Sequence, residues 1–577
     1  MATVYVNDKP VEIGEARLNA IEAAQRAGVF IPHYCWHPAL TVVASCRMCL
    51  VEVGELKDDG TVQMQPKVVP GCQTPVKHNM VIVTGEYGQH QPNEPIPTPL
   101  NYPANYGTPG QRAKKAQADT LEGLLLNHPL DCPVCDKAGE CKLQDFSYQY
   151  GRSTSRMIDE KNTPPNKPYI SSKITLFTDR CIMCTRCVRF TREYSGQGEL
   201  TVLQRGEHAE IDIFPGEPLE NKLSLNVVDL CPVGALGSKD FLYKQRVWYL
   251  KSTDSVCPDC STGCSIHLDT NKDIVYRLRP RENPRAQGWF MCDEGRLGYR
   301  YLNSKERLMR PLAGPRGQLG PKTWREIIPA LRRDLADRAG RSPDQVVAIL
   351  SPWLTCEEAF LLARYIKGLA PTATLALGPV PIRGEDDTYP KDRRGRPMQP
   401  VRFTIRAEKC PNRRGVEEVL RHFQGEVIPF DRVRDRFTAG QVNVAWVTIG
   451  ASPDRTGWDE ESARAVAQAG LLIVQDLFAG VLTQAAQYVL PSCGFSEKEG
   501  TFVNHAGLAQ GIRRATNPPQ EARAEGQVYL DLMGVTGLFQ AASVRRELAA
   551  TIPFFAPLAA GMDPLGIRLG QVPEPVA

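Results

Sequence analysis

The distribution of cysteine restricts what this chain can fold into more than any other feature of its sequence. The 577 residues include 18 cysteines, and all but three of them lie before residue 293, in four closely spaced sets. The first residues have neither the basic nor the apolar region of a secretory signal, so we expect a reducing compartment. Clustered cysteines in such a compartment indicate bound metal in preference to disulfides. The other three, Cys356, Cys410 and Cys493, share no ligand spacing, and we expect ordinary buried thiols.

The first set consists of Cys35, Cys46, Cys49 and Cys72. Three of these cysteines share one loop, and the fourth follows after a gap of 22 residues. A Cys-x2-Cys pair alone would favour zinc. A loop with three cysteines and a distant fourth is instead typical of plant-type [2Fe-2S] ferredoxins, in which the loop wraps the cluster. The set therefore favours a [2Fe-2S] cluster, with zinc as the alternative.

The second set consists of His128, Cys132, Cys135 and Cys141. Its three thiolates are one fewer than a [4Fe-4S] cluster needs, so a fourth ligand must come from elsewhere. His128 lies in the same loop, and as a neutral donor it would alter the net charge and the reduction potential of a cluster. On spacing alone, a zinc site with three cysteines and one histidine is equally compatible with these residues.

The third set consists of Cys181, Cys184, Cys187 and Cys231, and Pro232 follows the last cysteine. It corresponds to one half of the bacterial ferredoxin pattern C-x2-C-x2-C-x3-C-P. Thr191 stands where a two-cluster ferredoxin has its next cysteine, which indicates that the second cluster is lost and that Cys231 completes the remaining one. Zinc sites rarely use this spacing. The set therefore predicts one [4Fe-4S] cluster.

The fourth set consists of Cys257, Cys260, Cys264 and Cys292. Three closely spaced cysteines followed by a distant fourth suit a [4Fe-4S] cluster at the head of a larger domain. A zinc ribbon is the alternative, because such ribbons also use paired and distant cysteines.

The remaining sequence predicts several domains, since a single core rarely extends beyond about 250 to 300 residues. Residues 89–110 are rich in proline, so we expect a linker there. From about residue 310, apolar strand-like runs such as Val346–Leu350 alternate with helix-like runs such as Glu357–Leu369, which indicates an α/β layer with a parallel sheet. We interpret the basic stretch at residues 380–414 as a solvated loop or insertion.

Charge, hydropathy and missing motifs exclude other classes of protein. The net charge of +4 is too small on this length to indicate nucleic-acid binding. No apolar run approaches the roughly 18 residues that a membrane-spanning helix requires. No GxGxxG motif follows a strand and no P-loop motif is present, so we recognise no site for NADH, FMN or a nucleoside triphosphate. We therefore predict no catalytic residue in this chain.

A specific resemblance rests on the segments PHYC, SCRMC, HPLDCPVCD, GECKLQD and RCIMCTRCVRF, together with the fourth set. These segments resemble the large iron–sulfur subunit, of the 75 kDa type, of NADH-quinone oxidoreductase (respiratory complex I). Residues 310–577 resemble a shortened molybdopterin oxidoreductase domain, weakly, through LPSCGFSEKEGTFVNHAG. The sequence departs from the family at Ala44, where glycine is common, and in the gap before Cys72, where we expect an inserted hairpin around Asp58 to Gly60.

The resemblance implies one [2Fe-2S] and three [4Fe-4S] clusters, with His128 as a ligand. It implies a multidomain α+β and α/β fold, with a plant-type ferredoxin-like domain (1–88), a linker (89–115), a [4Fe-4S] domain with one histidine and three cysteine ligands (116–160), a bacterial ferredoxin-like domain (161–250), a [4Fe-4S] domain of molybdopterin-oxidoreductase type (251–308) and a truncated molybdopterin-oxidoreductase-like α/β domain (309–577). No molybdopterin is expected, because too little chain follows Cys292. Glu294 also replaces the lysine that related formate dehydrogenases have two residues after this cysteine.

The resemblance further implies an electron-transfer subunit of NADH-quinone oxidoreductase. Such a subunit relays single electrons from a flavin-bearing partner toward a quinone-reducing module, and the complex couples this transfer to proton translocation. The implied partners are the FMN- and NADH-binding subunit, the small [2Fe-2S] subunit and the quinone-side subunits, with no nucleic acid. The implied location is the cytoplasmic side of a bacterial inner membrane, reached only through the complex. Two alternatives stay open: a cluster-bearing catalytic subunit of an NAD-linked formate dehydrogenase or hydrogenase, and a zinc-binding scaffold.

Overall fold

Two compact units make up the chain. The structure, a computed structural model, describes residues 2–89 and 97–570. The first unit spans residues 1–248 together with 390–398, and the second spans residues 249–389 and 399–577. Residues 90–96 of the expected linker and residues 571–577 of the expected α/β domain lie outside the described residues. In the described ranges, no helix is both long enough and apolar enough to cross a bilayer.

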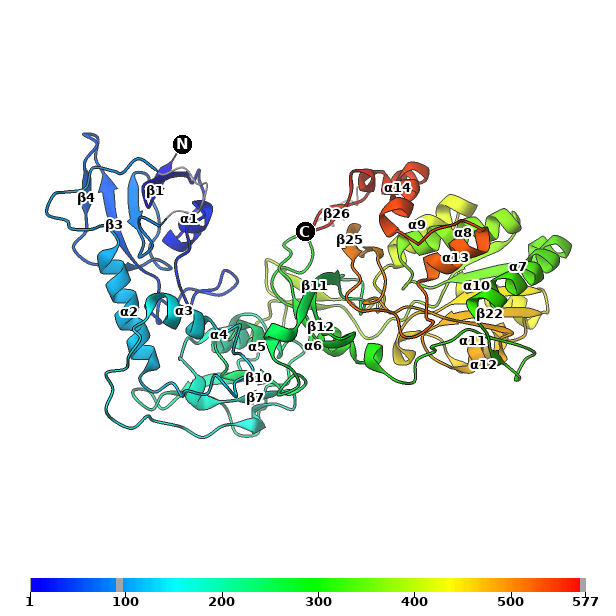
Figure 1. Cartoon of the computed structure of the whole chain (residues 1–577), viewed down its shortest axis with the longest axis horizontal. Helices are drawn as coiled ribbons and strands as arrows, with labels where there is room; N and C mark the ends of the chain where they lie inside the picture. The colour runs from blue at the N-terminus through cyan, green and yellow to red at the C-terminus, as the bar shows by residue number, and fades with distance from the viewer. Residues whose placement is uncertain (1, 90–96, 571–577) are drawn as a thin grey trace. The chain divides into compact units, whose positions relative to one another are not determined.

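The first unit begins with a mixed sheet and one short helix (Figure 1). The strands pair in the order β2-β1-β6-β3-β4, and β5 also pairs with β3. They are β1 (Thr3–Val6), β2 (Lys9–Glu12), β3 (Leu50–Leu56), β4 (Val62–Met64), β5 (Val69–Pro70) and β6 (Met80–Val83). Helix α1 (Ala20–Arg26) starts after Asn19, whose side chain forms a capping box with Glu22. The expected hairpin around residues 58–60 is confirmed, because β3 and β4 pair antiparallel on either side of it.

Short helices and two-stranded sheets form the rest of the first unit. Helix α2 (Gln111–Leu125) packs against β3 and against α3 (Lys142–Tyr150). Two antiparallel pairs follow, β7 with β10 and β8 with β9. These strands are β7 (Ile174–Leu176), β8 (Leu200–Leu203), β9 (Glu210–Ile213) and β10 (Leu236–Ser238). Helices α4 (Arg186–Glu193) and α5 (Asn226–Leu230) contact each other and carry or adjoin cysteines of the third set.

The second unit begins with a three-stranded antiparallel sheet, followed by helix α6 (Asp293–Leu297). The strands of this sheet are β11 (Lys251–Val256), β12 (Ser265–Asn271) and β13 (Ile274–Pro280). Cys257, Cys260 and Cys264 lie in the loop between β11 and β12, and Cys292 lies between β13 and α6. Two further small sheets are formed by β18 (Asp387–Tyr389) with β19 (Phe403–Ile405), and by β24 (Gly500–Val503), β25 (Leu508–Ile512) and β26 (Ile567–Arg568).

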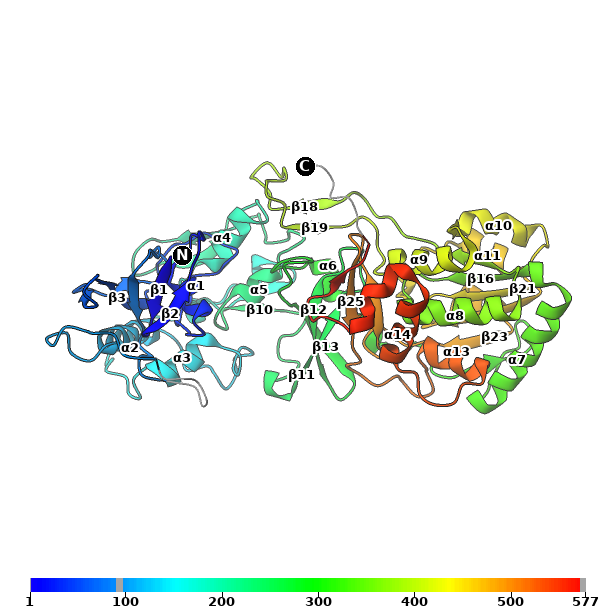
Figure 2. The same cartoon turned by 90° about the horizontal axis from the view of Figure 1, so that it is seen from above.

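A large sheet dominates the second unit (Figure 2). Its eight strands pair in the order β15-β14-β23-β22-β21-β16-β17-β20. Its strands are β14 (Leu312–Ala313), β15 (Gly320–Pro321), β16 (Val346–Leu350), β17 (Thr374–Leu377), β20 (Ile428–Pro429), β21 (Val444–Thr448), β22 (Leu471–Asp476) and β23 (Tyr488–Pro491). All pairings from β23 to β20 are parallel, which confirms the expected α/β layer. Residues 380–414 interrupt this sheet as an insertion that contains the β18–β19 hairpin.

Helices cover both faces of the eight-stranded sheet. Along β16, Val346, Ala348 and Leu350 face one core, whereas Val347 and Ile349 face the other, as the two-residue period of a strand requires. The first core is completed by α7 (Trp324–Arg341), α8 (Cys356–Leu369), α9 (Arg413–Gln424), α13 (Glu525–Met533) and α14 (Ala541–Thr551). The second is completed by α10 (Phe430–Thr438), α11 (Glu460–Val466) and α12 (Val481–Ala485). This unit therefore has a large apolar core of its own.

Candidate metal centres

The four cysteines of the first set lie together and are buried. The neighbouring thiols of Cys46 and Cys72 lower the pKa of the Cys35 thiol, and Cys72 lowers that of Cys49, so these side chains lie close to one another. The backbone amide of Cys35 also donates to Cys46 Sγ at 3.4 Å. In the wrapping loop, Ala44 has a φ of 51°, in the left-handed region where glycine is favoured. The left-handed conformation of Ala44 thus bends the loop that carries Cys35, Cys46 and Cys49.

The second set lines one cavity with an empty volume of about 290 Å³. Among the described residues, His128 Nδ1 is buried and has no hydrogen-bond partner. Burial, helped by nearby positive charges, lowers the pKa of His128 to about 4, so the imidazole is neutral at pH 7. A neutral imidazole with an unused ring nitrogen is the form that binds metal. Together with Cys132, Cys135 and Cys141, this residue fits a cluster held by three thiolates and one histidine.

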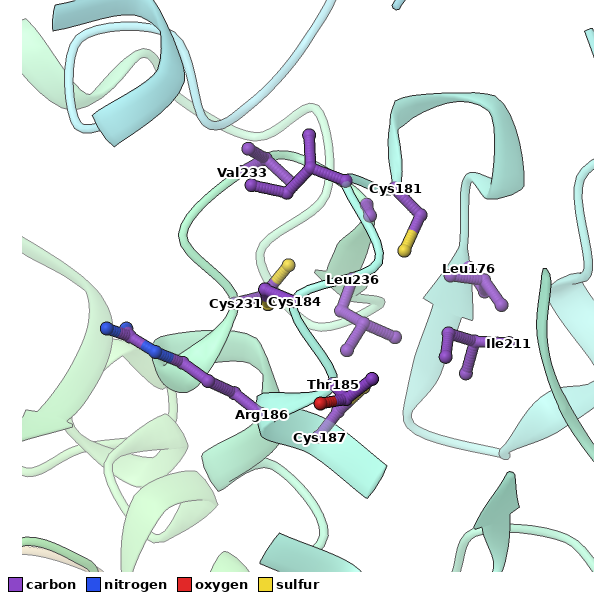
Figure 3. A pocket seen from close by; sticks show the side chains of 12 residues that line it. Leu176, Cys181, Cys184, Thr185, Arg186, Cys187, Ile211, Cys231, Val233 and Leu236 are labelled. Atoms are coloured by element: carbon purple, nitrogen blue, oxygen red, sulfur yellow. The ribbon is translucent and has the colours of Figure 1, made fainter. Parts of the chain in front are cut away.

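The third set surrounds another cavity, the third cavity, with an empty volume of about 370 Å³ (Figure 3). The cavity of the second set is called the second cavity. Apolar side chains complete its lining, among them Leu176, Ile211 and Leu236. Burial raises the pKa of the Cys184 thiol to about 11 and holds that of Cys187 well above its ordinary value. Thiols in such an apolar setting ionise only when a metal or another cation compensates the charge. The donor set and the apolar lining therefore fit a cluster shielded from water.

The fourth set is buried in the second unit, and none of its four cysteines is more than 4% exposed. Cys292 lies at the start of α6, where its Sγ accepts a hydrogen bond of 3.3 Å from the Gly295 amide. A Cβ atom on Gly295 would lie 2.9 Å from Cys257 Sγ and 3.4 Å from Cys292 Sγ. The missing side chain of Gly295 therefore leaves room for these two thiols at the helix start.

Paired charges flank the fourth set. Lys409 Nζ donates to Glu294 Oε2 at 2.7 Å. Arg455 forms an ion pair with Asp259 and lies 3.7 Å from Glu294. Glu294 is the residue that replaces the lysine of related formate dehydrogenases, so this position carries a carboxylate bonded to a lysine from a distant segment. Each of these two cations thus has a carboxylate partner.

One short segment, residues 231–235, borders both the second and the third cavity. Cys231 and Val233 line the third cavity, and Gly234 lines the second. A Cβ atom on Gly234 would lie only 2.1 Å from Cys135 Sγ, so glycine alone permits this approach. Gly234 was not predicted as a site residue. Its only signal in the sequence is its position three residues after Cys231, the last cysteine of the third set.

None of the four predicted ligand sets converges on a single point among the described residues. Within residues 2–89 and 97–570, no group of three or more His, Cys, Asp or Glu side chains is arranged so that it could hold a metal ion. The second and third sets surround cavities instead, and Cys132 is exposed. The three remaining cysteines, Cys356, Cys410 and Cys493, are fully buried, which confirms that expectation.

Models of known protein families match the chain in the same order as the four cysteine sets. Residues 1–87 match the 2Fe-2S iron-sulfur cluster binding domain, and residues 117–156 match the NADH-ubiquinone oxidoreductase-G iron-sulfur binding region. Residues 171–237 match the ferredoxin-like domain of NADH-quinone oxidoreductase subunit 3. Residues 250–304 match the molybdopterin oxidoreductase Fe4S4 domain, and residues 433–535 match molybdopterin oxidoreductase. The fold and these matches define a multidomain protein with [2Fe-2S] and [4Fe-4S] binding domains.

Individual curated proteins give a more specific match than the family models. The chain is 34% identical over 370 residues to the G subunit of NADH-quinone oxidoreductase from Rickettsia conorii, covering 64% of this chain and 49% of the relative. It is 32% identical over 368 residues to the G subunit from Streptomyces coelicolor, covering 64% and 39%. It is 32% identical over 395 residues to the NADH-ubiquinone oxidoreductase 75 kDa subunit of Reclinomonas americana, covering 68% and 51%. These matches confirm the resemblance, although the chain spans only about half the length of the Rickettsia and Reclinomonas relatives.

A solved structure of NAD+-reducing [NiFe]-hydrogenase in the H2-reduced state is a distant match. It covers 43% of this chain and 91% of its own length, with 21% sequence identity and a TM-score of 0.32. A likeness at this level decides neither the fold nor the function.

Proposed function

We propose that this chain is an electron-transfer subunit of a NADH-quinone oxidoreductase, with four clusters as one-electron carriers. The proposed ligands are Cys35, Cys46, Cys49 and Cys72 for a [2Fe-2S] cluster, and His128, Cys132, Cys135 and Cys141, then Cys181, Cys184, Cys187 and Cys231, then Cys257, Cys260, Cys264 and Cys292 for three [4Fe-4S] clusters. When bound, such clusters accept and release single electrons without a substrate site in the chain.

The observation that carries the proposal is the wall shared by the second and third cavities. Residues 231–235 border both of them, and Gly234 lets Cys135 Sγ approach the backbone of this segment. Two carriers separated by one peptide segment suit the stepwise transfer of single electrons. A zinc scaffold would have no need for two such cavities lined by one short segment.

The protein contributes burial, ligand type and orientation to this function. The apolar lining of the third cavity, including Leu176 and Leu236, excludes water and disfavours added charge. In the second cavity, His128 is held neutral, so it offers a ligand without the negative charge of a thiolate. These differences support two sites with distinct reduction potentials.

The proposed electron donor is a flavin-bearing partner subunit, and the proposed acceptor lies on the quinone side of the complex. The small [2Fe-2S] subunit is a further proposed partner. We place the chain at the cytoplasmic face of a bacterial inner membrane, attached only through the complex, which as a whole couples electron transfer to proton translocation. The domain boundaries predicted from the sequence belong to the same proposal.

Metal analysis of the anaerobically purified chain tests the proposal. One [2Fe-2S] and three [4Fe-4S] clusters require about fourteen irons per chain and as many acid-labile sulfides, without zinc or molybdenum. About four zinc ions without sulfide would refute the electron-transfer role in favour of a scaffold. Stoichiometric molybdenum would instead support a catalytic subunit of the formate dehydrogenase type.

The His128→Cys variant tests the unusual ligand of the second site. If His128 is a ligand, a thiolate in its place adds negative charge, and the reduction potential of that cluster falls. An EPR-monitored redox titration measures the shift. An unchanged potential with full iron content would refute ligation by His128.

A further inference from the structure

Three buried arginines are interleaved with the cysteines of the third set. Arg180, Arg186 and Arg189 lie within RCIMCTRCVRF, and each is at most 7% exposed. Arginine is rarely buried to this extent unless a carboxylate neutralises it. The partners of these three guanidinium groups therefore show where negative charge is supplied and where it is missing.

Arg180 has the expected partner. Its Nη2 lies 2.8 Å from Asp131 Oδ2, and its guanidinium stacks over the Phe177 ring at 4.1 Å. Asp131 belongs to the loop of the second set and lines the second cavity. Arg180 thus ties the third set to the second with its charge already balanced.

Arg189 has no carboxylate partner among the described residues, and it bonds only to carbonyl groups. Its Nη2 donates to the carbonyl of Cys35 at 2.5 Å and to that of Cys184 at 3.3 Å. Its Nη1 donates to the carbonyl of Thr41 at 2.5 Å. Cys35 is a ligand residue of the first set and Cys184 one of the third, so a single guanidinium joins the two ligand loops.

Arg186, which lies in α4 like Arg189, also donates only to carbonyl groups. Its guanidinium points away from the third cavity (Figure 3). It donates to the carbonyl of Leu230, at 3.3 Å, and to that of Trp36, residues that each adjoin a ligand cysteine. In the described part of the chain, it too has no carboxylate partner.

The charge that balances these two arginines must come from what the two sites bind. A buried guanidinium without a counter-ion is strongly unfavourable, and carbonyl dipoles compensate only part of its charge. A cluster held by four thiolates carries net negative charge, and each site would present one to the same pair of cations. Both sites and both arginines belong to the first unit, so their spacing is fixed by its packing.

We propose that Arg186 and Arg189 are counter-ions shared by the first and third cluster sites, with Arg189 fixing the spacing of their ligand loops. This inference rests on the proposed electron-transfer function. A positive charge stabilises the reduced form of a cluster, which is the more negative one, so each arginine raises both reduction potentials. Changing one arginine therefore alters two carriers at once.

The test is an EPR-monitored redox titration of the full chain with its clusters assembled, comparing Arg189→Gln, Arg189→Lys and Arg192→Gln. In Arg189→Gln we expect the potentials of the [2Fe-2S] cluster and of the third-site cluster to fall together. In Arg189→Lys the charge remains, and both potentials stay closer to the parent. Arg192 lies on the same helix but is exposed and bonds Thr201, so Arg192→Gln should change neither potential.

A fall confined to the third-site cluster, or no fall at all, would overturn the inference. If Arg189→Gln does not retain its clusters, Arg186→Gln takes its place with the same two outcomes. Iron and sulfide content of the parent separates this result from the proposed function, because a parent without sulfide refutes the electron-transfer role before any variant is compared.

Discussion

The cluster sites of the first unit and the single site of the second balance their charges differently. Around the fourth set, Lys409 pairs with Glu294, and Arg455 pairs with Asp259. Between the first and third sets, Arg186 and Arg189 bond only to carbonyl groups of the described residues. The polypeptide around the fourth site is therefore neutralised by its own side chains, whereas Arg186 and Arg189 have no carboxylate partner among the described residues.

The second unit also has a larger apolar core than the region around the third set in the first unit. The sheet of the second unit is covered on both faces by helices, and its central strands β21 and β22 are completely buried. The region of the third set has only two-stranded sheets and short helices around its cavity. The second unit thus has the means to stay folded without a cluster, and the region of the third set has far less.

Removal of iron gives the largest expected effect. After anaerobic chelation we expect β7, β10 and α4 to lose hydrogen-exchange protection, because Arg186 and Arg189 lose their counter-charge and the cavity loses its filling. Strands β21 and β22 should remain protected by their core. Hydrogen exchange read by mass spectrometry measures both regions in one sample. Equal loss of protection in the two units would contradict the contrast between them.

Glycine substitutions at two sites should give the next largest effect. In Gly234→Ala the new methyl group would meet Cys135 Sγ at 2.1 Å, and we expect loss of about four irons from the second site. In Gly295→Ala the nearest contact, with Cys257 Sγ, is 2.9 Å, so the fourth site should keep its iron with an altered EPR signal. Gly123→Ala is the control, since nothing lies within 4 Å of its Cβ position. Full iron content in Gly234→Ala would show that the shared wall can shift.

Charge changes at the fourth site should have a smaller effect than those at Arg189. Lys409→Met removes a positive charge and should lower the potential of the fourth cluster, whereas Glu294→Gln should raise it. The double variant should lie close to the parent, because the pair is removed as a unit. Redox titration of the fourth signal provides the measurement. A double variant as far from the parent as Lys409→Met would mean that the pair does not neutralise itself.

The pH dependence of the second unit should give the smallest effect. Burial raises the pKa of Asp476, at the end of β22, to about 7 from an ordinary value of 3.8. A carboxyl group with a raised pKa binds its proton more tightly in the folded state, so stability is lost as the pH rises from about 4 to about 7. Asp476→Asn removes this loss and should be more stable than the parent at pH 8.

Thermal unfolding of the full chain between pH 4 and pH 8 measures this difference. The advantage of Asp476→Asn should grow up to about pH 7 and then level off. A constant difference across this range would show that Asp476 is not the titrating group. The Asp454→Asn variant is a control, because Asp454 is an exposed carboxyl group.

The sequence predicted the elements whose signals are local. Strand β16 was expected at its observed residues, and α8 begins only one residue before the expected Glu357. Apolar runs and capping residues determine such elements within a few positions. The cysteine sets were visible for the same reason, because most of their ligands lie within one loop.

Contacts between distant segments were not visible in the sequence. Arg189 meets the Cys35 carbonyl across 154 residues, and Lys409 meets Glu294 across 115. The basic stretch at residues 380–414 was expected to be a solvated loop or insertion, and residues 382–386 and 393–402 are exposed. The sequence did not indicate that residues 390–398 belong to the first unit, where the Lys391 amide donates to the Tyr194 carbonyl. No local pattern specifies such partners, because they depend on how segments that are distant in the sequence pack together.

The segment from Cys231 to Gly234 has a consequence for maturation of the protein. Its first residue is a proposed ligand of the third cluster, and its last residue forms the backbone surface against which Cys135 packs. Inserting a cluster into the third site therefore immobilises part of the second before any iron arrives there. The two sites should be loaded cooperatively, and chains with one of them filled and the other empty should be scarce during biosynthesis.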